Sequence, residues 1–224
     1  MKKFLIKLCF LLICIPYSVV ASSDTITVMV YGDSLSTSYG IPSEAGWVNL
    51  LNKRLQARSP VYKIVNVSIS GETTLGGRNR IEQAIKEHAP DIILIGLGGN
   101  DGLRGSSIKS IYGNLEAIVN ACLKSQTKVL LLGMRLPPNY GTKYTQKFQD
   151  IYPQLAEHHQ LNHVPFLLDG FGEKRTYFLQ DGIHPNEEAQ EKIVENVWKK
   201  LMPILEDQEN AIISSVESAI MTAS

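Results

Sequence analysis

The sequence predicts a three-layer α/β fold with a parallel sheet between two layers of helices. Five short runs rich in Val, Ile and Leu show little alternation between apolar and polar residues, which is typical of parallel strands buried on both faces. Longer segments with helical spacing separate these runs, so that strand and helix alternate along the chain. A chain of 224 residues is long enough for one domain with a substantial core.

The individual elements follow in a regular order. The predicted strands are TITVMVY, KIVNV, DIILIGL, KVLLLG and VPFLL, at residues 25–31, 63–67, 91–97, 128–133 and 164–168. The predicted helices carry apolar residues at helical spacing and cover residues 45–57, 77–88, 107–124, 144–161 and 186–205. The apolar pattern of 115–123 indicates that Cys122 is a small core residue. Residues 22–205 are therefore predicted to form one domain.

Composition and charge are those of an ordinary soluble globular protein. Hydrophobic residues make up 44% of the chain, and 22 basic residues balance 22 acidic ones. Without a basic stripe or an acidic run, nucleic acid is not expected as a partner. A monomer is the default expectation.

Residues 1–21 are predicted to be a signal peptide. A positively charged start precedes a short apolar stretch at 4–15, and small residues precede a cleavage site after Ala21. The stretch is short for a membrane span, although retention as an N-terminal anchor fits the same pattern. Cleavage would leave Cys122 as the one cysteine, so no intramolecular disulfide is expected. The mature protein is expected in the periplasm or outside the cell.

Polar and glycine-rich motifs follow the predicted strands. They are residues 32–34, 70–72, 98–101 and 135–140 after the first four strands, and 181–184 before the last helix. In parallel α/β sheets, ligands bind beyond the carboxyl ends of the strands. The motifs therefore predict a site at this edge of the sheet.

Ser34, His184 and Asp181 are the predicted catalytic residues. A serine hydroxyl is a weak nucleophile unless an imidazole takes its proton, and a carboxylate must orient that imidazole. The spacing of Asp181 and His184 fits one tight loop. The sequence also contains three alternative acids, which share no short loop with His184: Asp33, Asp101 and Asp169. The simpler interpretation of Ser34 is a helix N-cap.

Three hydrogen-bond donors are predicted to form an oxyanion hole. The N–H of Ser34 lies near a helix N-terminus, where the backbone favours negative charge. The N–H of Gly71 is unobstructed by a side chain, and the Asn100 amide is a donor that cannot titrate. The simpler interpretations are a turn glycine at 71 and an Asx turn at 100.

Several other kinds of site are not supported. The glycine patterns of nucleotide-binding loops do not occur, and Ser36 stands where a nucleophile elbow requires glycine, which argues against the α/β-hydrolase fold. Asp181 and His184 offer two metal ligands without an evident third. No metal and no cofactor are expected. The remaining histidines are interpreted as solvated surface residues: His88, His158, His159 and His163.

The motifs together resemble the SGNH (GDSL) hydrolases. Gly-Asp-Ser-Leu-Ser at 32–36, Gly71, Gly-Gly-Asn-Asp at 98–101 and Asp-x-x-His-Pro at 181–185 look like the four signature blocks of that family. Residues 27–205 share the resemblance. Further stretches are similar to the bacterial subgroup of multifunctional acyl-CoA thioesterase I, lysophospholipase L1 and arylesterase.

The resemblance implies a flavodoxin-like five-stranded sheet and a serine esterase or thioesterase without cofactor. Ser34, His184 and Asp181 match the family's triad, and Ser34, Gly71 and Asn100 match its oxyanion hole. Residues 102–107 match a mobile substrate-binding loop. Expected substrates are small acyl esters, acyl thioesters or lysophospholipids, with transient membrane-surface contact. A carbohydrate O-acetylesterase and a non-catalytic acyl- or lipid-binding protein are the alternatives.

Two features remain open at this point. Five residues are predicted to line a substrate groove, although each also fits ordinary loop packing: Leu103, Pro137, Pro138, Tyr140 and Tyr144. Residues 206–224 have no counterpart in the family. Their apolar residues fall at helical spacing, which fits a weak amphipathic helix, a segment that docks on the domain or a membrane, or a frayed tail.

Overall fold

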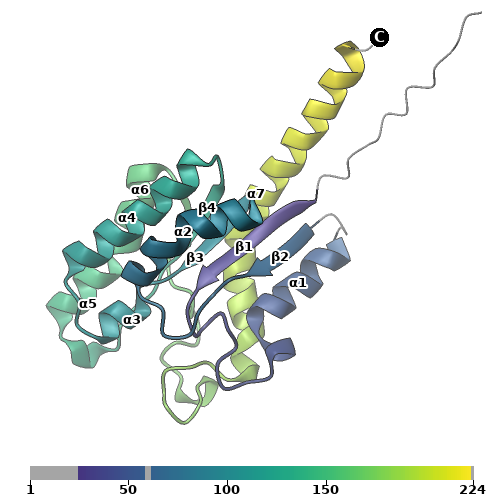
Figure 1. Ribbon diagram of the computed structural model, residues 1–224. Helices are drawn as coiled ribbons and strands as arrows, with labels where there is room; N and C mark the ends of the chain where they lie inside the picture. The colour runs from purple at the N-terminus through teal and green to yellow at the C-terminus, as the bar shows by residue number, and fades with distance from the viewer. Residues whose placement is uncertain (1–24, 59–61, 223–224) are drawn as a thin grey trace, which may run out of the picture.

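A computed structural model describes residues 25–58 and 62–222, and a parallel sheet lies at its centre (Figure 1). The five strands are paired in the order β2-β1-β3-β4-β5, and every pair is parallel. They are β1 (Ile26–Gly32), β2 (Tyr62–Asn66), β3 (Ile92–Gly96), β4 (Lys128–Leu132) and β5 (Asn162–Val164). The predicted five-stranded parallel sheet is confirmed.

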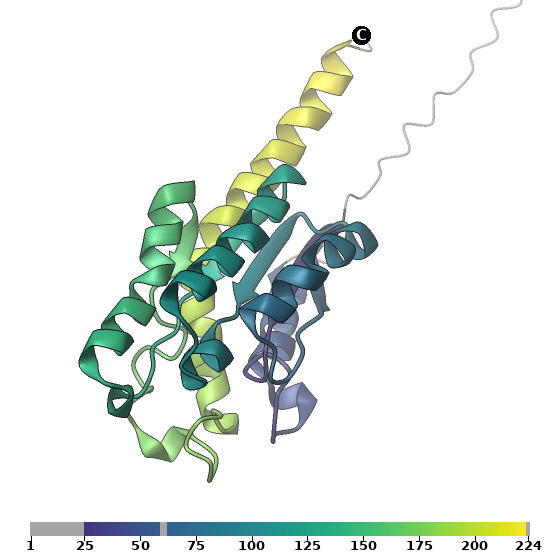
Figure 2. The ribbon, with the colours of Figure 1, turned by 60° about the vertical axis from the view of Figure 1, so that its left-hand side comes forward.

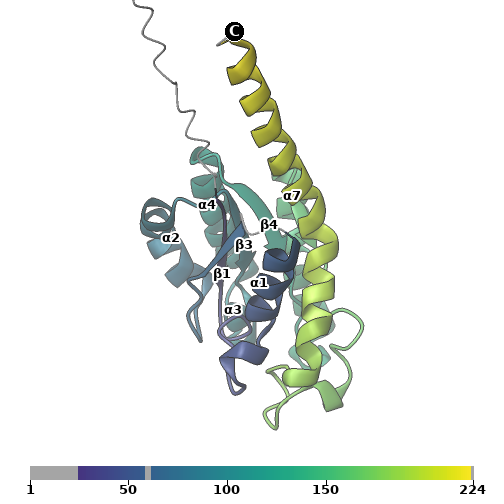
Figure 3. The ribbon, with the colours of Figure 1, turned by 90° about the vertical axis from the view of Figure 1, so that its right-hand side faces the viewer.

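Helices cover both faces of the sheet (Figures 1 and 3). One face carries α1 (Trp47–Arg58) and α7 (Glu187–Thr222). The other carries α2 (Thr74–His88), α4 (Ile108–Lys124), α5 (Thr142–Gln149) and α6 (Ile151–His159). Because successive residues of a strand point to opposite faces, Val28 and Val30 pack toward α1 and α7, whereas Met29 and Tyr31 pack toward α2 and α4. The predicted three layers are therefore present.

The sheet order brings several loops together at one edge. The chain leaves β1 on one side toward β2 and then crosses to β3 on the other side, so the strand order reverses at β1. Such a reversal creates a crevice at the carboxyl ends of the strands. Gly32 pairs with Gly96 at the ends of β1 and β3. The loops that follow these two strands therefore leave the sheet side by side.

Two prolines explain where the predicted elements differ from the observed ones. The predicted helix 144–161 is two helices, α5 and α6, which meet at Asp150. Pro153 lies in the first turn of α6, where its missing N–H needs no partner, but its ring does not fit a helix that continues from α5. The fifth strand was predicted at 164–168 but lies at Asn162–Val164, and it ends there because Pro165 has no N–H to extend the ladder.

The last helix is longer than predicted. It runs from Glu187 to Thr222 without a break at Leu205, and its far end projects from the domain (Figures 1 and 2). Glu209 fastens the extension to the body through an ion pair with Arg58, 3.0 Å between Oε2 and Nη2, and a hydrogen bond from the Tyr62 hydroxyl. Ile212 still packs against the core. The helical spacing of 206–222 thus corresponds to a continuation of α7.

The structure also tests the predicted burial of Cys122 and the presence of membrane-spanning helices. Cys122 is fully buried, as predicted, and burial raises the pKa of its thiol to about 12. Across residues 25–58 and 62–222, no helix has both the length and the apolar character needed to cross a membrane. The predicted signal peptide, 1–21, lies outside the described residues.

Candidate active site

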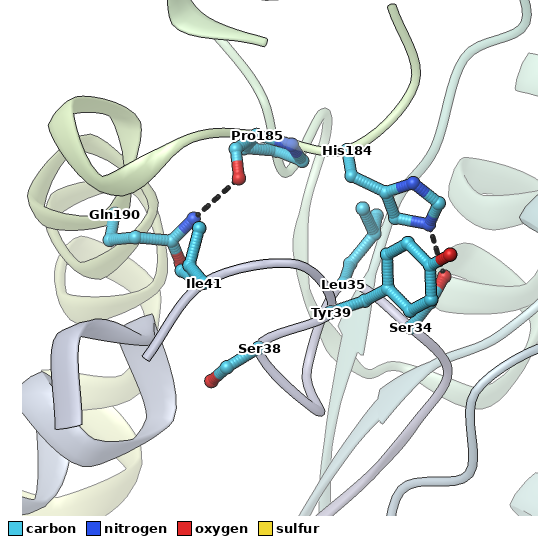
Figure 4. Close-up of a pocket in the computed structure, with 8 residues that line it drawn as sticks. All are labelled: Ser34, Leu35, Ser38, Tyr39, Ile41, His184, Pro185 and Gln190. Atoms are coloured by element: carbon cyan, nitrogen blue, oxygen red, sulfur yellow. Dashed lines mark hydrogen bonds between the residues drawn. The ribbon is translucent and has the colours of Figure 1, made fainter. Parts of the chain in front are cut away.

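Ser34 lies in the turn that follows β1. Gly32 ends the strand in a place without room for a side chain, because a Cβ there would come within 2.7 Å of the Ser36 hydroxyl and 3.2 Å of the Gly96 carbonyl. The close packing of the two strand ends holds the turn against the sheet. From this turn the Ser34 Oγ lies 2.9 Å from Nε2 of His184, which is 150 residues later in the sequence (Figure 4).

Asp181 holds the other side of the imidazole. Its Oδ2 lies 2.7 Å from His184 Nδ1, while Oδ1 accepts the backbone N–H groups of Ile183 at 2.8 Å and His184 at 3.0 Å. Burial acts to raise the pKa of Asp181, but these hydrogen bonds outweigh it and lower the pKa to about 2. The carboxylate is therefore ionised at neutral pH, and it fixes both the loop and the ring.

Tyr39 covers one face of the imidazole. The two ring centroids are 4.4 Å apart at an interplanar angle of 37°, and Figure 4 shows the tyrosine beside His184 and Ser34. Tyr39 follows Ser38, which adopts a positive φ of 61° that turns the chain back toward the site. No local pattern in the sequence marks Tyr39 as a neighbour of His184, so it was not among the predicted site residues.

The residues predicted as oxyanion donors lie on loops that contact the Ser34 turn. Asn100 belongs to a short helix, α3 (Gly99–Leu103), and its Nδ2 donates to Asp33 Oδ2 at 3.1 Å. The loop that carries Gly71 is linked to the Ser34 turn by a hydrogen bond of 2.7 Å between the hydroxyls of Ser70 and Thr37. Gly71 adopts a φ of 78°, a conformation that favours glycine.

Asp33 is a buried carboxylate beneath the site. It accepts hydrogen bonds from the Leu35 N–H at 3.0 Å and from Asn100, and it is 4% exposed. Burial raises the pKa of Asp33 to about 6, although the Leu35 N–H and the nearby His184 act in the opposite direction. Asp33 thus orients Asn100, a role that its neighbours in sequence do not reveal.

The alternative acids do not contact the His184 ring nitrogens. Asp181 occupies Nδ1, and Ser34 lies at Nε2. Asp101 instead accepts the N–H and the hydroxyl of Thr74, at 2.8 and 2.7 Å. Asp169 belongs to a separate cavity between β5 and α7. Of the histidines predicted to be solvated, His158 is 61% exposed, but the His159 side chain is only 13% exposed, so that prediction was wrong for His159.

Two of the predicted groove residues, Tyr140 and Tyr144, are hydrogen-bonded to residues 103–106. The Tyr140 hydroxyl donates to the Leu103 carbonyl at 3.1 Å, and the Tyr144 hydroxyl donates to the Ser106 carbonyl at 2.7 Å. These bonds attach the end of α3 to the beginning of α5. Pro137 and Pro138 are exposed in the preceding turn.

A shallow hollow beside Ser34 is lined by a different set of residues. Leu35, Ser38, Tyr39 and Ile41 form one side, and Pro185 and Gln190 form the other (Figure 4). The buried Gln190 accepts the Trp47 N–H at 3.0 Å and donates to the Pro185 carbonyl at 3.1 Å. It thereby fastens the loop that carries His184 to α1. Gln190 was not among the predicted site residues, because its partner Trp47 is 143 residues away in the sequence.

A serine, an imidazole and a carboxylate joined by hydrogen bonds at the switch point of a parallel sheet define the arrangement of a serine hydrolase. The profile of the GDSL-like lipase/acylhydrolase family matches residues 30–192. The chain therefore belongs to this family, as the sequence motifs indicated.

Known proteins support the assignment along most of the chain. Esterase TesA of Pseudomonas aeruginosa is 40% identical over 205 residues, covering 92% of this chain and 100% of the esterase. Thioesterase 1/protease 1/lysophospholipase L1 of Escherichia coli is 38% identical over 185 residues, 83% of this chain and 86% of that protein. The crystal structure of TesA matches with a TM-score of 0.77 and 42% identity, covering 79% of this chain and 98% of that one. These relatives define the chain as a carboxylic ester hydrolase.

Proposed function

We propose that the chain is a serine esterase and thioesterase that hydrolyses acyl esters, acyl thioesters or lysophospholipids through Ser34, His184 and Asp181. The observation that carries the proposal is the hydrogen-bonded chain from Ser34 Oγ through the imidazole to Asp181. The names of the relatives support the substrate classes, since they include an esterase and a thioesterase with lysophospholipase activity.

The proposed reaction begins with attack of Ser34 Oγ on the acyl carbonyl carbon. The hydroxyl proton passes to His184 Nε2, and Asp181 stabilises the resulting imidazolium. The tetrahedral intermediate then expels the alcohol or thiol, which takes the proton from Nε2 and leaves an acyl ester on Ser34. Water, deprotonated by the same nitrogen, attacks that ester, and the second tetrahedral intermediate releases the carboxylic acid as Ser34 Oγ leaves and takes the proton back from Nε2.

The proposed oxyanion hole consists of the N–H groups of Ser34 and Gly71 and the side-chain amide of Asn100. An asparagine amide has two N–H donors. One of them is directed to Asp33 Oδ2, so the second remains for the substrate oxygen. Because the Asp33 bond limits rotation of the amide, the donor is oriented before the substrate arrives, which is the condition for effective stabilisation of a developing charge.

The acyl group is proposed to lie along residues 102–107 and the adjoining turn, with contacts from Leu103, Pro137, Pro138, Tyr140 and Tyr144. Support comes from the tyrosine hydroxyl bonds that hold Leu103 and Ser106 beside this turn. Movement of the segment on acyl binding would require these two bonds to break or shift. The proposed substrate is a small-molecule acyl ester, thioester or lysophospholipid, and a lysophospholipid would bring the protein into transient contact with a membrane surface.

Residues 1–21 are proposed to direct the protein out of the cytoplasm and to be removed after Ala21, so that a monomer acts in the periplasm or outside the cell. The pattern of charge, apolar residues and small residues supports this proposal. Mass spectrometry of the protein recovered from a periplasmic extract would show an N-terminus at Ser22. An intact N-terminus in a membrane fraction would contradict it.

Hydrolysis of p-nitrophenyl esters from acetyl to palmitoyl tests the catalytic proposal. Ser34→Ala is expected to lower kcat by about 10⁴-fold or more, while Ser125→Ala, a change at an exposed serine, is expected to leave kcat unchanged. Acyl-CoA and lysophospholipid assayed alongside distinguish the leaving groups. Wild-type activity in Ser34→Ala would overturn the proposal. Exclusive release of acetate from acetylated sugars would favour an O-acetylesterase instead.

A further inference from the structure

A second cluster of polar side chains lies between α4 and α6. Glu116 comes from the middle of α4, and His158 and His159 are the last two residues of α6. The two helices lie side by side on the same face of the sheet (Figures 1 and 2). Glu116 Oε1 lies 3.4 Å from His158 Nδ1 and 3.9 Å from His159 Nε2. The three groups therefore converge on one point.

His159 has a buried ring nitrogen that no described residue satisfies with a hydrogen bond. Its side chain is 13% exposed, and within the part of the chain that the structure describes its buried Nε2 has no hydrogen-bond partner. The Glu116 oxygen at 3.9 Å is too distant for a hydrogen bond. Buried polar atoms in folded proteins almost always have a partner. A bound cation between Nε2 and the carboxylate would supply one.

We propose that Glu116, His158 and His159 bind a divalent transition metal ion, with Zn²⁺ as the best match. Two imidazoles and one carboxylate, completed by water, form a known tetrahedral zinc ligand set. With metal–ligand bonds of about 2.0 Å, the edges of such a tetrahedron measure about 3.3 Å. The distance of 3.4 Å between Glu116 Oε1 and His158 Nδ1 is already close to this edge length. The ligating atoms of all three residues lie within 4.8 Å of one another.

Only small movements are needed to close the site. His158 is 61% exposed, so its ring is free to turn, and the Glu116 side chain is 31% exposed. The two imidazole rings already pack together with centroids 4.5 Å apart. The Tyr112 hydroxyl, 3.4 Å from His158 Nδ1, would lose that weak contact when the metal binds. The ion would then join α4 to α6.

The metal site lies at the other end of the sheet from Ser34. His159 is followed after two residues by the amino end of β5, whereas Ser34 follows the carboxyl end of β1. The ion is therefore not a participant in ester hydrolysis. Its expected effect is to stabilise the contact between two helices, and it should leave kcat unchanged.

Calorimetric titration of the untagged protein with ZnCl₂ tests the proposal. We expect saturable binding of one Zn²⁺ per chain, and a rise in the thermal unfolding temperature at saturation. His158→Ala and Glu116→Gln should each weaken binding by about tenfold or more. Both residues are exposed enough for the variants to fold. X-ray absorption of the zinc complex should show nitrogen and oxygen ligands at about 2.0 Å.

His88→Ala is the matched control. His88 also faces a glutamate, with Nε2 3.9 Å from Glu87 Oε1, but it lies on α2. This variant should bind Zn²⁺ as the wild type does. Equal losses in His88→Ala and His158→Ala would show general binding by surface histidines and overturn the proposal. So would the absence of saturable binding at about 100 μM Zn²⁺, because a three-ligand site should be well occupied at that concentration.

Discussion

Replacing Asp33 with asparagine should remove a pH-dependent loss of stability and should lower the activity. The carboxyl group is 4% exposed, and burial raises its pKa from 3.8 to about 6, against the opposing effects of the Leu35 N–H, His184 and Asn100. One pKa unit corresponds to about 1.4 kcal/mol. Above pH 6, ionisation of Asp33 therefore lowers the free energy of unfolding by about 3 kcal/mol relative to the protein with protonated Asp33.

The stability effect has a defined pH dependence. Because the pKa of Asp33 in the folded protein lies above its unfolded value, the native state retains a proton between about pH 4 and 6 that the unfolded chain has released. The free energy of unfolding of the wild type therefore falls as the pH rises through this window. Asparagine does not ionise, so the variant lacks this decline. Its stability relative to the wild type should increase by about 2–3 kcal/mol between pH 4 and pH 8, measured by urea denaturation.

The loss of activity follows from the hydrogen bonds of the carboxylate. Asp33 accepts one bond on each oxygen, from Leu35 N and from Asn100 Nδ2. Asparagine offers only one oxygen, so its amide would face a donor and release Asn100 from its orientation. Loss of one oxyanion donor lowers kcat by about 10²–10³-fold. We expect a fall of about 10²-fold in kcat for p-nitrophenyl butyrate, with little change in KM.

Asp207→Asn, which removes an exposed carboxylate on α7, is the control for both measurements. It should leave kcat unchanged and should not reproduce the pH-dependent gain. The burial argument would be refuted by a stability difference between Asp33→Asn and wild type that stays constant from pH 4 to pH 8. Full kcat in the folded variant would refute the orientation of Asn100 by Asp33.

Two further substitutions test the site. Asp181→Asn keeps an oxygen for the N–H groups of Ile183 and His184 but no longer fixes the imidazole tautomer. The kcat should therefore fall by about 10³–10⁴-fold, while circular dichroism should show that the variant is folded. A fall in kcat of less than tenfold would contradict the role of Asp181. Tyr144→Phe removes the bond of 2.7 Å to the Ser106 carbonyl, worth about 1 kcal/mol. In Tyr144→Phe, the KM for long acyl esters should rise several-fold, whereas the control Tyr112→Phe should leave KM unchanged. Equal KM values in the two variants would count against a substrate role for residues 102–107.

Local patterns were sufficient to predict most elements of the fold and part of the site. The three central strands, β1, β3 and β4, are buried and apolar along most of their length, so their runs were recognisable without knowledge of their neighbours. The edge strand β5 is short and mostly unburied, and its predicted run at 164–168 shares only Val164 with it. The contact between Asp181 and His184 also lies within one loop, and short-range spacing is enough to predict it. The edge of the sheet that holds the site follows from the chain direction of parallel strands.

The meeting of Ser34 and His184 depended on the tertiary structure. Their contact at 2.9 Å spans 150 residues, and it requires the sheet order together with the anchoring of the His184 loop by Gln190. Sequence spacing does not determine such a distance, because many strand orders are compatible with the same alternation of strands and helices. The sequence therefore identified the residues, and the fold brought them within hydrogen-bonding distance.

The environment of each side chain was likewise a tertiary property. Asp33 and His159 lie in polar stretches typical of solvated segments, yet packing of distant elements buries both. The altered pKa of Asp33, and the lack of a hydrogen-bond partner for His159 Nε2 among the described residues, arise from that burial. The amino-acid order alone establishes which chemical groups this hydrolase has. The tertiary structure decided which of them are desolvated, because desolvation depends on all the atoms around a group and not on its neighbours along the chain.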